Sequence, residues 1–99
     1  EIFAAVISVI PYDGGDDAAV AMANDSQYGL SGAVWSADPE RALDVARRIR
    51  TGTVTVNGFT YDVGLPFGGF KQSGIGREWG LEGLEAYIEY QTINLPDGL

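Results

Sequence analysis

The sequence predicts an α/β protein in which strand, helix, strand, helix and strand follow one another, before a long loop, a short helix and a C-terminal edge strand. Two observations carry this prediction. Segments rich in apolar and β-branched residues at 4–10, 30–35 and 53–57 are separated by helix-forming segments, and this alternation is typical of parallel α/β units. The 99 residues, 45% of them hydrophobic, suffice for one small domain.

The first expected strand covers residues 4–10 (AAVISVI), a nearly continuous apolar run that ends at Pro11. Such a run suits a parallel-type strand that is covered on both faces. Glycines and acidic residues at 13–17 then favour a helix N-terminus, and the helix-forming run 18–23 ends in NDS at 24–26. We therefore expect a short first helix.

The second strand is expected at residues 30–35 (LSGAVW), and the helix after it has a clear start at Asp38 and Pro39. Within residues 39–50 the apolar positions recur at helical spacing: Ala42, Val45, Ala46 and Ile49. Gly52 follows as a stop signal. The arginines near the end (47, 48 and 50) favour a solvated helix end over an anion site.

The third strand is expected at residues 53–57 (TVTVN), where valines alternate with threonines. Residues 58–76 form a long loop rich in glycine and aromatic residues, and this aromatic density argues for a functional loop and against disorder. A short helix is expected at 78–86 and a final strand at 87–95 (YIEYQTINL).

The segment PFGGFKQSGIGRE at residues 66–78 raises the possibility of phosphate binding, since glycine lets backbone N–H groups approach an anion. Its spacing does not match the P-loop, which needs a lysine and a hydroxyl directly after its last glycine. It matches the dinucleotide fingerprint only in a loose form. The favoured interpretation is tight turns beside a packed surface.

Composition excludes several function classes. Six Lys and Arg against 14 Asp and Glu give a net charge of −8, which opposes binding to nucleic acid or to an anionic membrane. The absence of Cys and His removes the thiol nucleophile, the imidazole base and the usual zinc ligands, so no metal site is expected. No apolar run approaches the ~20 residues of a membrane span, and we expect a soluble, cytoplasmic protein. Because the chain opens at Glu1 directly into an apolar segment, we expect a segment of a longer protein.

Three segments together resemble the C-terminal end of the aldehyde dehydrogenase superfamily: EIF at 1–3, TGTVTVNG at 51–58 and PFGGFKQSGIGRE at 66–78. The resemblance implies that residues 1–86 are the C-terminal part of a catalytic domain. It also implies that residues 87–99 are an oligomerisation strand and tail, joining a homo-oligomer through 87–95.

The family resemblance also implies a chemistry, the NAD- or NADP-dependent oxidation of an aldehyde to a carboxylate through a thioester on a cysteine. This chain has no cysteine, so by itself it is expected to contain no catalytic residue, to be inactive and to bind no cofactor tightly. Two alternatives are a free-standing, non-catalytic assembly module with the same fold and an unrelated small α/β binding protein.

The resemblance further implies which residues meet the substrate. In the family the glycine-rich run is a structural turn that sets the wall of the aldehyde tunnel, and Phe67 would line that wall. Phe59 and Tyr61 would face the same tunnel, and Leu65 would join them. An apolar wall is suited to the hydrocarbon tail of an aldehyde and keeps water from the reacting carbon.

Cofactor contacts are implied at the other end of the chain. Glu1 matches the glutamate that accepts hydrogen bonds from the hydroxyls of the nicotinamide ribose, and Phe3 would pack beside the nicotinamide. Ala4 and Ala5 stand where the family has Gly-Pro, which changes the allowed backbone angles next to both residues.

Four further motif residues, Asn57, Lys71, Arg77 and Glu78, are interpreted as scaffold residues that satisfy backbone groups and pair charges in turns.

Overall fold

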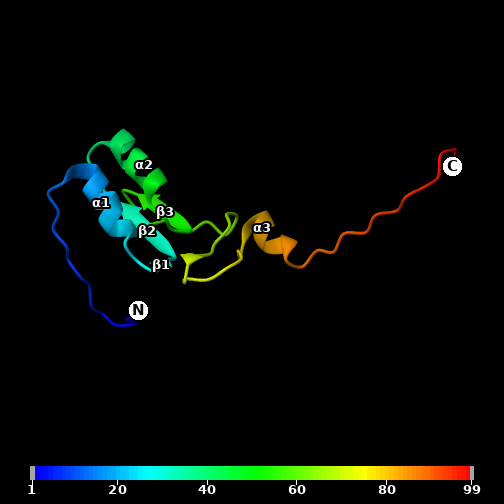
Figure 1. Cartoon of the computed structure of the whole chain (residues 1–99), viewed down its shortest axis with the longest axis horizontal. Coiled ribbons are helices and arrows are strands. Elements are labelled where there is room, and N and C mark those ends of the chain that lie inside the picture. The colour runs from blue at the N-terminus through cyan, green and yellow to red at the C-terminus, as the bar shows by residue number, and fades with distance from the viewer. Residues whose placement is uncertain (1, 99) are drawn as a thin grey trace.

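The computed structural model of the chain describes residues 2–98. Within them the helices and strands are α1 (Gly15–Asn24), β1 (Tyr28–Gly29), β2 (Ser31–Val34), α2 (Pro39–Arg48), β3 (Thr53–Val56), β4 (Phe70–Lys71) and α3 (Gly80–Glu85). The elements α1 to β4 form a small α/β body, and both ends of the chain run away from it as extended segments (Figure 1). The predicted fold class is confirmed.

The centre of the body is a parallel β–α–β unit. Strands β2 and β3 pair in parallel, with Ser31 opposite Thr53 and Val34 opposite Val56, and α2 connects them. A second pair, β1 with β4, is antiparallel and places Tyr28 opposite Lys71. This second pair folds the glycine-rich loop back onto the body.

Helix α2 forms as its local signals predict. The Asp38 carboxylate accepts hydrogen bonds from the backbone N–H groups of Glu40 at 3.0 Å and Arg41 at 3.2 Å, which satisfies two donors that the first helical turn leaves free. Its inner face buries Ala42 and Ala46. The helix ends at Arg48, two residues short of the predicted end at Arg50, because Ile49 turns to an extended conformation.

The Asp38 cap provides a first prediction. Asp38→Ala should lower the free energy of unfolding by about 1 kcal/mol, the typical loss when an N-cap side chain is removed. The matched control is Asp44→Ala, in the same helix but away from its start, where alanine is the better helix former. Urea unfolding of the two variants checks this, and equal losses would contradict the capping role.

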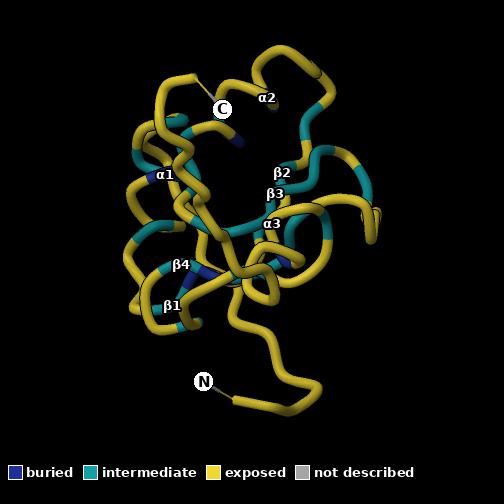
Figure 2. Tube along the Cα trace, turned by 90° about the vertical axis from the view of Figure 1, so that its right-hand side faces the viewer, coloured by how far each residue is buried: buried dark blue, intermediate teal, exposed yellow. Residues whose placement is uncertain are grey.

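The buried core is small and lies between the two longer helices and the parallel sheet. Val20, Ala42 and Ala46 are its buried apolar residues among those described, and Figure 2 shows most of the remaining trace as exposed. An ion pair of 2.6 Å joins α1 to α2, between Asp16 and Arg41. Hydrogen bonds from the Arg41 guanidinium hold the pKa of Asp16 below its usual value.

The end of α2 is a second link between these helices. Arg48 pairs with Asp17 at 2.6 Å, and the amide of Asn24 donates to the carbonyl of Arg48 at 2.9 Å. Arg48 therefore links α2 to α1, a role that the interpretation of these arginines as a solvated helix end did not include.

Two predicted strands are wrong for the chain as described. Residues 4–10 and 87–95 belong to no strand, and their large apolar side chains are exposed. A strand exists only with a partner that takes up its N–H and C=O groups, and neither segment pairs with a strand within residues 2–98. The last helix also starts at Gly80 instead of residue 78, because the backbone of Glu78 pairs with Phe67.

In the part of the chain that the structure describes, no helix has the length and apolar character needed to cross a membrane.

Candidate functional site

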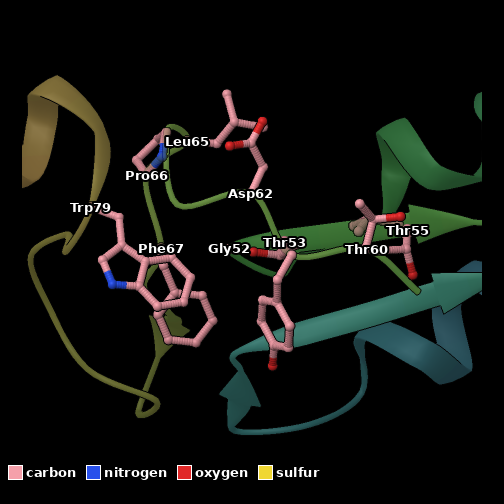
Figure 3. Close-up of a pocket in the computed structure, with 11 residues that line it drawn as sticks. Gly52, Thr53, Thr55, Thr60, Asp62, Leu65, Pro66, Phe67 and Trp79 are labelled. Atoms are coloured by element: carbon pink, nitrogen blue, oxygen red, sulfur yellow. The ribbon is translucent and has the colours of Figure 1, made fainter.

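The candidate site is a hollow between the sheet and the loop that follows β3. It measures about 470 Å³ and is lined by Thr53 and Thr55 of β3 and by the rings of Tyr61, Phe67 and Trp79 (Figure 3). A second hollow of about 270 Å³ is also lined by Thr53, Thr55, Tyr61 and Phe67, and adds Phe59 and residues 31–33 of β2. Together they are called the aromatic hollow below.

The four rings of the aromatic hollow form a continuous chain of contacts. Phe59 meets Tyr61 edge to face, with centroids 4.9 Å apart and planes at 86°. Tyr61 meets Trp79 in the same way at 6.0 Å and 84°, and Phe67 lies tilted against Trp79 at 5.0 Å and 33°. Such geometries are favourable beyond the area that they bury. The rings therefore support one another and still offer apolar surface to a ligand.

Close backbone contacts hold the glycine-rich loop beside β3. A Cβ atom on Gly52 would overlap the carbonyl oxygen of Gly68. The two backbone segments can therefore touch only because Gly52 has no side chain. The backbones of Phe67 and Glu78 exchange two hydrogen bonds of 2.7 Å. These contacts hold Phe67 in the lining of the hollow.

The glycine-rich segment makes turns, as predicted. Gly74 and Gly76 adopt φ angles of 121° and 83°. Residues with a Cβ atom rarely adopt such positive φ angles. Arg77 donates from its guanidinium to the carbonyl oxygens of Gly69 at 3.1 Å and Gly76 at 2.7 Å. This cation therefore serves the loop's own backbone.

The scaffold interpretation is also confirmed for two other motif residues. The side-chain amide of Asn57 accepts from the N–H of Ser36 and donates to its carbonyl, both at 2.8 Å. The Lys71 ammonium donates to the backbone carbonyl oxygen of Asn24, the last residue of α1, at 2.8 Å and to that of Ser26 at 2.9 Å. Each of them ties a loop to the body.

The structure brings the predicted substrate residues together. Phe59, Tyr61, Phe67 and Leu65 all line the aromatic hollow. Phe3 does not join them, since it is 95% exposed and lines neither part of the hollow. Glu1 lies outside the described residues.

Sequence reasoning missed Trp79, Thr53 and Thr55 as lining residues. The alternation of TVTV contained the signal for the threonines, because side chains two apart in a strand share a face. For Trp79 no local signal exists, since its place depends on the pairing of Glu78 with Phe67. Residues 2–98 hold no group of three or more acidic, His or Cys side chains placed to bind a metal ion.

Comparison with known proteins identifies the family. Residues 1–93 match the family model described as the aldehyde dehydrogenase family. The chain belongs to this family. It is 53% identical over 95 residues to the geranial dehydrogenase of Castellaniella defragrans, covering 96% of the chain and 20% of that protein. It is 50% identical over 93 residues to a 3-succinoylsemialdehyde-pyridine dehydrogenase of Pseudomonas sp, covering 94% and 19%.

Solved structures of aldehyde dehydrogenases share the fold. The Mycobacterium tuberculosis aldehyde dehydrogenase complexed with NAD+ superposes with a TM-score of 0.82 at 49% identity, covering 91% of this chain and 18% of that one. A mutant of aldehyde dehydrogenase C from Pseudomonas syringae, complexed with NAD+ and octanal, superposes with a TM-score of 0.76 at 50% identity, covering 81% and 16%. The chain thus spans about a fifth of the length of the curated relatives that it matches.

Proposed function

We propose that this chain is the C-terminal segment of the catalytic domain of an NAD(P)-dependent aldehyde dehydrogenase, which oxidises an aldehyde to a carboxylate. The observation that carries the proposal is the aromatic hollow, found in a chain 49 to 53% identical to aldehyde dehydrogenases. Because the chain contains no cysteine, the attacking thiolate has to come from another part of the enzyme.

In this proposal the aromatic hollow is the apolar wall of the aldehyde site. Its rings receive the hydrocarbon tail, and their bulk excludes water from the reacting carbonyl group. The Pseudomonas syringae relative was solved with octanal, an aldehyde whose alkyl tail calls for an apolar wall of this kind.

The cofactor contacts are a separate part of the proposal. Glu1 would accept hydrogen bonds from the ribose hydroxyls and Phe3 would pack beside the nicotinamide. Support for these roles comes from the resemblance of EIF to the family motif and not from geometry, because Phe3 projects into solvent. NAD is the favoured cofactor, since both solved relatives named above bind NAD+.

We also propose that residues 87–95 join copies of the enzyme and that the boundary with the catalytic part lies near residue 86. Helix α3 ends at Glu85, and the tail runs away from the rest of the chain after it (Figure 1). The same exposed tail would suit the alternative function, a free-standing assembly module without catalytic activity.

A segment exchange tests the proposed function. The matching segment of the Castellaniella defragrans geranial dehydrogenase, 53% identical to this chain, is replaced by residues 1–95 to make a chimeric enzyme. NADH formation is then measured with geranial and with other aldehydes, and the intact geranial dehydrogenase is the control. We expect turnover by the chimeric enzyme and none by the 99-residue chain alone. A folded chimeric enzyme without turnover, or NADH formation by the isolated chain, would contradict the proposal.

Phe67→Ala in the chimeric enzyme should raise KM for bulky apolar aldehydes far more than for acetaldehyde. Truncating a partly buried ring removes about 1–3 kcal/mol of apolar contact, roughly 5- to 150-fold in KM, and only where the substrate reaches the ring. Steady-state kinetics with a series of aldehydes of increasing size measures this effect.

Phe70→Ala is the matched control for Phe67. The Phe70 ring is covered by the guanidinium groups of Arg50 at 4.9 Å and Arg77 at 5.6 Å, away from the aromatic hollow. Its loss should change large and small aldehydes alike. If Phe67→Ala also changes both alike, Phe67 belongs to the scaffold instead.

A further inference from the structure

Trp79 is the ring of the aromatic hollow to which the sequence assigned no role. It contacts two neighbours at once, the face of Phe67 at 5.0 Å and the ring of Tyr61 at 6.0 Å. It is 39% exposed and lines the larger part of the hollow (Figure 3). A ligand can therefore reach the indole, which packs against the Phe67 ring.

The backbone of Trp79 has a conformation that normally requires glycine. Its φ is 62° and its ψ is 170°, in a region that residues with a side chain occupy only at a conformational cost. The surrounding structure enforces it from both sides. Glu78 exchanges two hydrogen bonds with Phe67, and the N–H of Gly80 donates to the carbonyl of Val63 at 3.2 Å.

This clamp sets the direction of the indole. Since residues 78 and 80 are each tied to the loop that carries the other rings, the side chain between them projects over Phe67. A glycine would fit the same backbone without cost. The presence of tryptophan instead points to a role for the ring itself.

We propose that Trp79 is a specificity-determining residue, which selects aldehydes whose tails carry flat, ring-bearing or conjugated apolar groups. The proposal rests on the function proposed above. Flat π-systems gain from stacking on one ring and meeting the edge of another, and Trp79 and Tyr61 present such a corner with planes at 84°. A flexible saturated tail gains only buried area there, and it loses more conformational freedom when it is ordered.

The test compares two aldehydes of equal carbon number, cinnamaldehyde and nonanal, in the chimeric enzyme. Trp79→Leu removes the ring, and Trp79→Gly removes the ring while relaxing the backbone, so at least one of them should fold like the unsubstituted protein. The matched control is Trp35→Leu, at the other tryptophan, which is 70% exposed and does not line the aromatic hollow. Melting temperatures establish which variants are folded.

We expect both Trp79 variants to lower the ratio of kcat/KM for cinnamaldehyde to that for nonanal by about tenfold, mainly through KM. Trp35→Leu should leave the ratio unchanged. An unchanged ratio in a folded Trp79 variant, or an equal loss for both aldehydes, would overturn the proposal.

A binding measurement separates this proposal from the proposed function. Calorimetric titration with cinnamyl alcohol and with nonanol, which are unreactive analogues, reports tail selection without turnover. If the unsubstituted chimeric enzyme does not oxidise aldehydes, the proposed function fails. The proposed role of Trp79 still holds if removing the ring weakens the binding of cinnamyl alcohol about tenfold more than the binding of nonanol. Equal changes in the two affinities would contradict it.

Discussion

Gly52→Ala is expected to destabilise the chimeric enzyme by about 3 kcal/mol, at the upper end of the usual cost of overpacking. The new methyl group would overlap the carbonyl oxygen of Gly68, which is a backbone atom and cannot rotate away. The glycine-rich loop would have to move off β3, and it would take Phe67 with it. We therefore expect loss of selectivity for bulky aldehydes as well as loss of stability. Thermal inactivation and guanidinium unfolding measure the loss of stability, and the aldehyde series measures the loss of selectivity.

Gly58→Ala is the matched control for Gly52→Ala. A Cβ atom at Gly58 would meet only the carbonyl oxygen of Val56, at an ordinary contact distance of 3.8 Å. Its effect on the free energy of unfolding should stay within about 0.5 kcal/mol. If Gly52→Ala unfolds at the same denaturant concentration as Gly58→Ala, the close contact between β3 and the loop is not what holds the hollow together.

The predicted elements that proved correct were those with local signals. Helix α2 starts at the position that Asp38 and Pro39 predict, because an N-cap side chain binds backbone N–H groups two and three residues further along the chain. The parallel pair β2–β3 followed from two short strand patterns on either side of that helix. Both signals are complete within a few residues, so the sequence alone contains them.

The missed features depend on residues far apart in the chain. Apolar composition predicted strands at 4–10 and 87–95, but a strand also needs a neighbour, and none is present within residues 2–98. The contact of Gly52 with Gly68 joins two loops, and the place of Trp79 follows from the pairing of Glu78 with Phe67. The roles of Phe67, Phe59 and Tyr61 were proposed from the family resemblance, since no local pattern distinguishes a ring that lines a hollow from a ring in a core.

The tail at residues 87–95 is expected to make the chain self-associate at micromolar concentrations. Tyr90 is 85% exposed, and the neighbouring apolar side chains also face solvent. Among the described residues, the backbone from 89 to 97 takes part in no backbone hydrogen bond. An extended edge with free N–H and C=O groups and apolar side chains favours pairing with another strand. Sedimentation velocity of the 99-residue chain measures this association.

Two adjacent proline substitutions test whether the tail pairs as a strand. Adjacent N–H groups of a strand point to opposite edges, so Gln91→Pro and Thr92→Pro remove donors from different edges. If one edge forms the contact between copies, one of the two variants should weaken association by roughly 5- to 150-fold and the other much less. This factor corresponds to about 1–3 kcal/mol for a buried group that is left without its hydrogen-bond partner.

Ile88 is unsuitable for this test because its N–H already donates to the carbonyl of Glu85 at 3.2 Å. A monomeric unsubstituted chain, or association that neither proline weakens, would contradict assembly through the tail. In that case the apolar side chains of the tail have to be covered within the enzyme's own subunit.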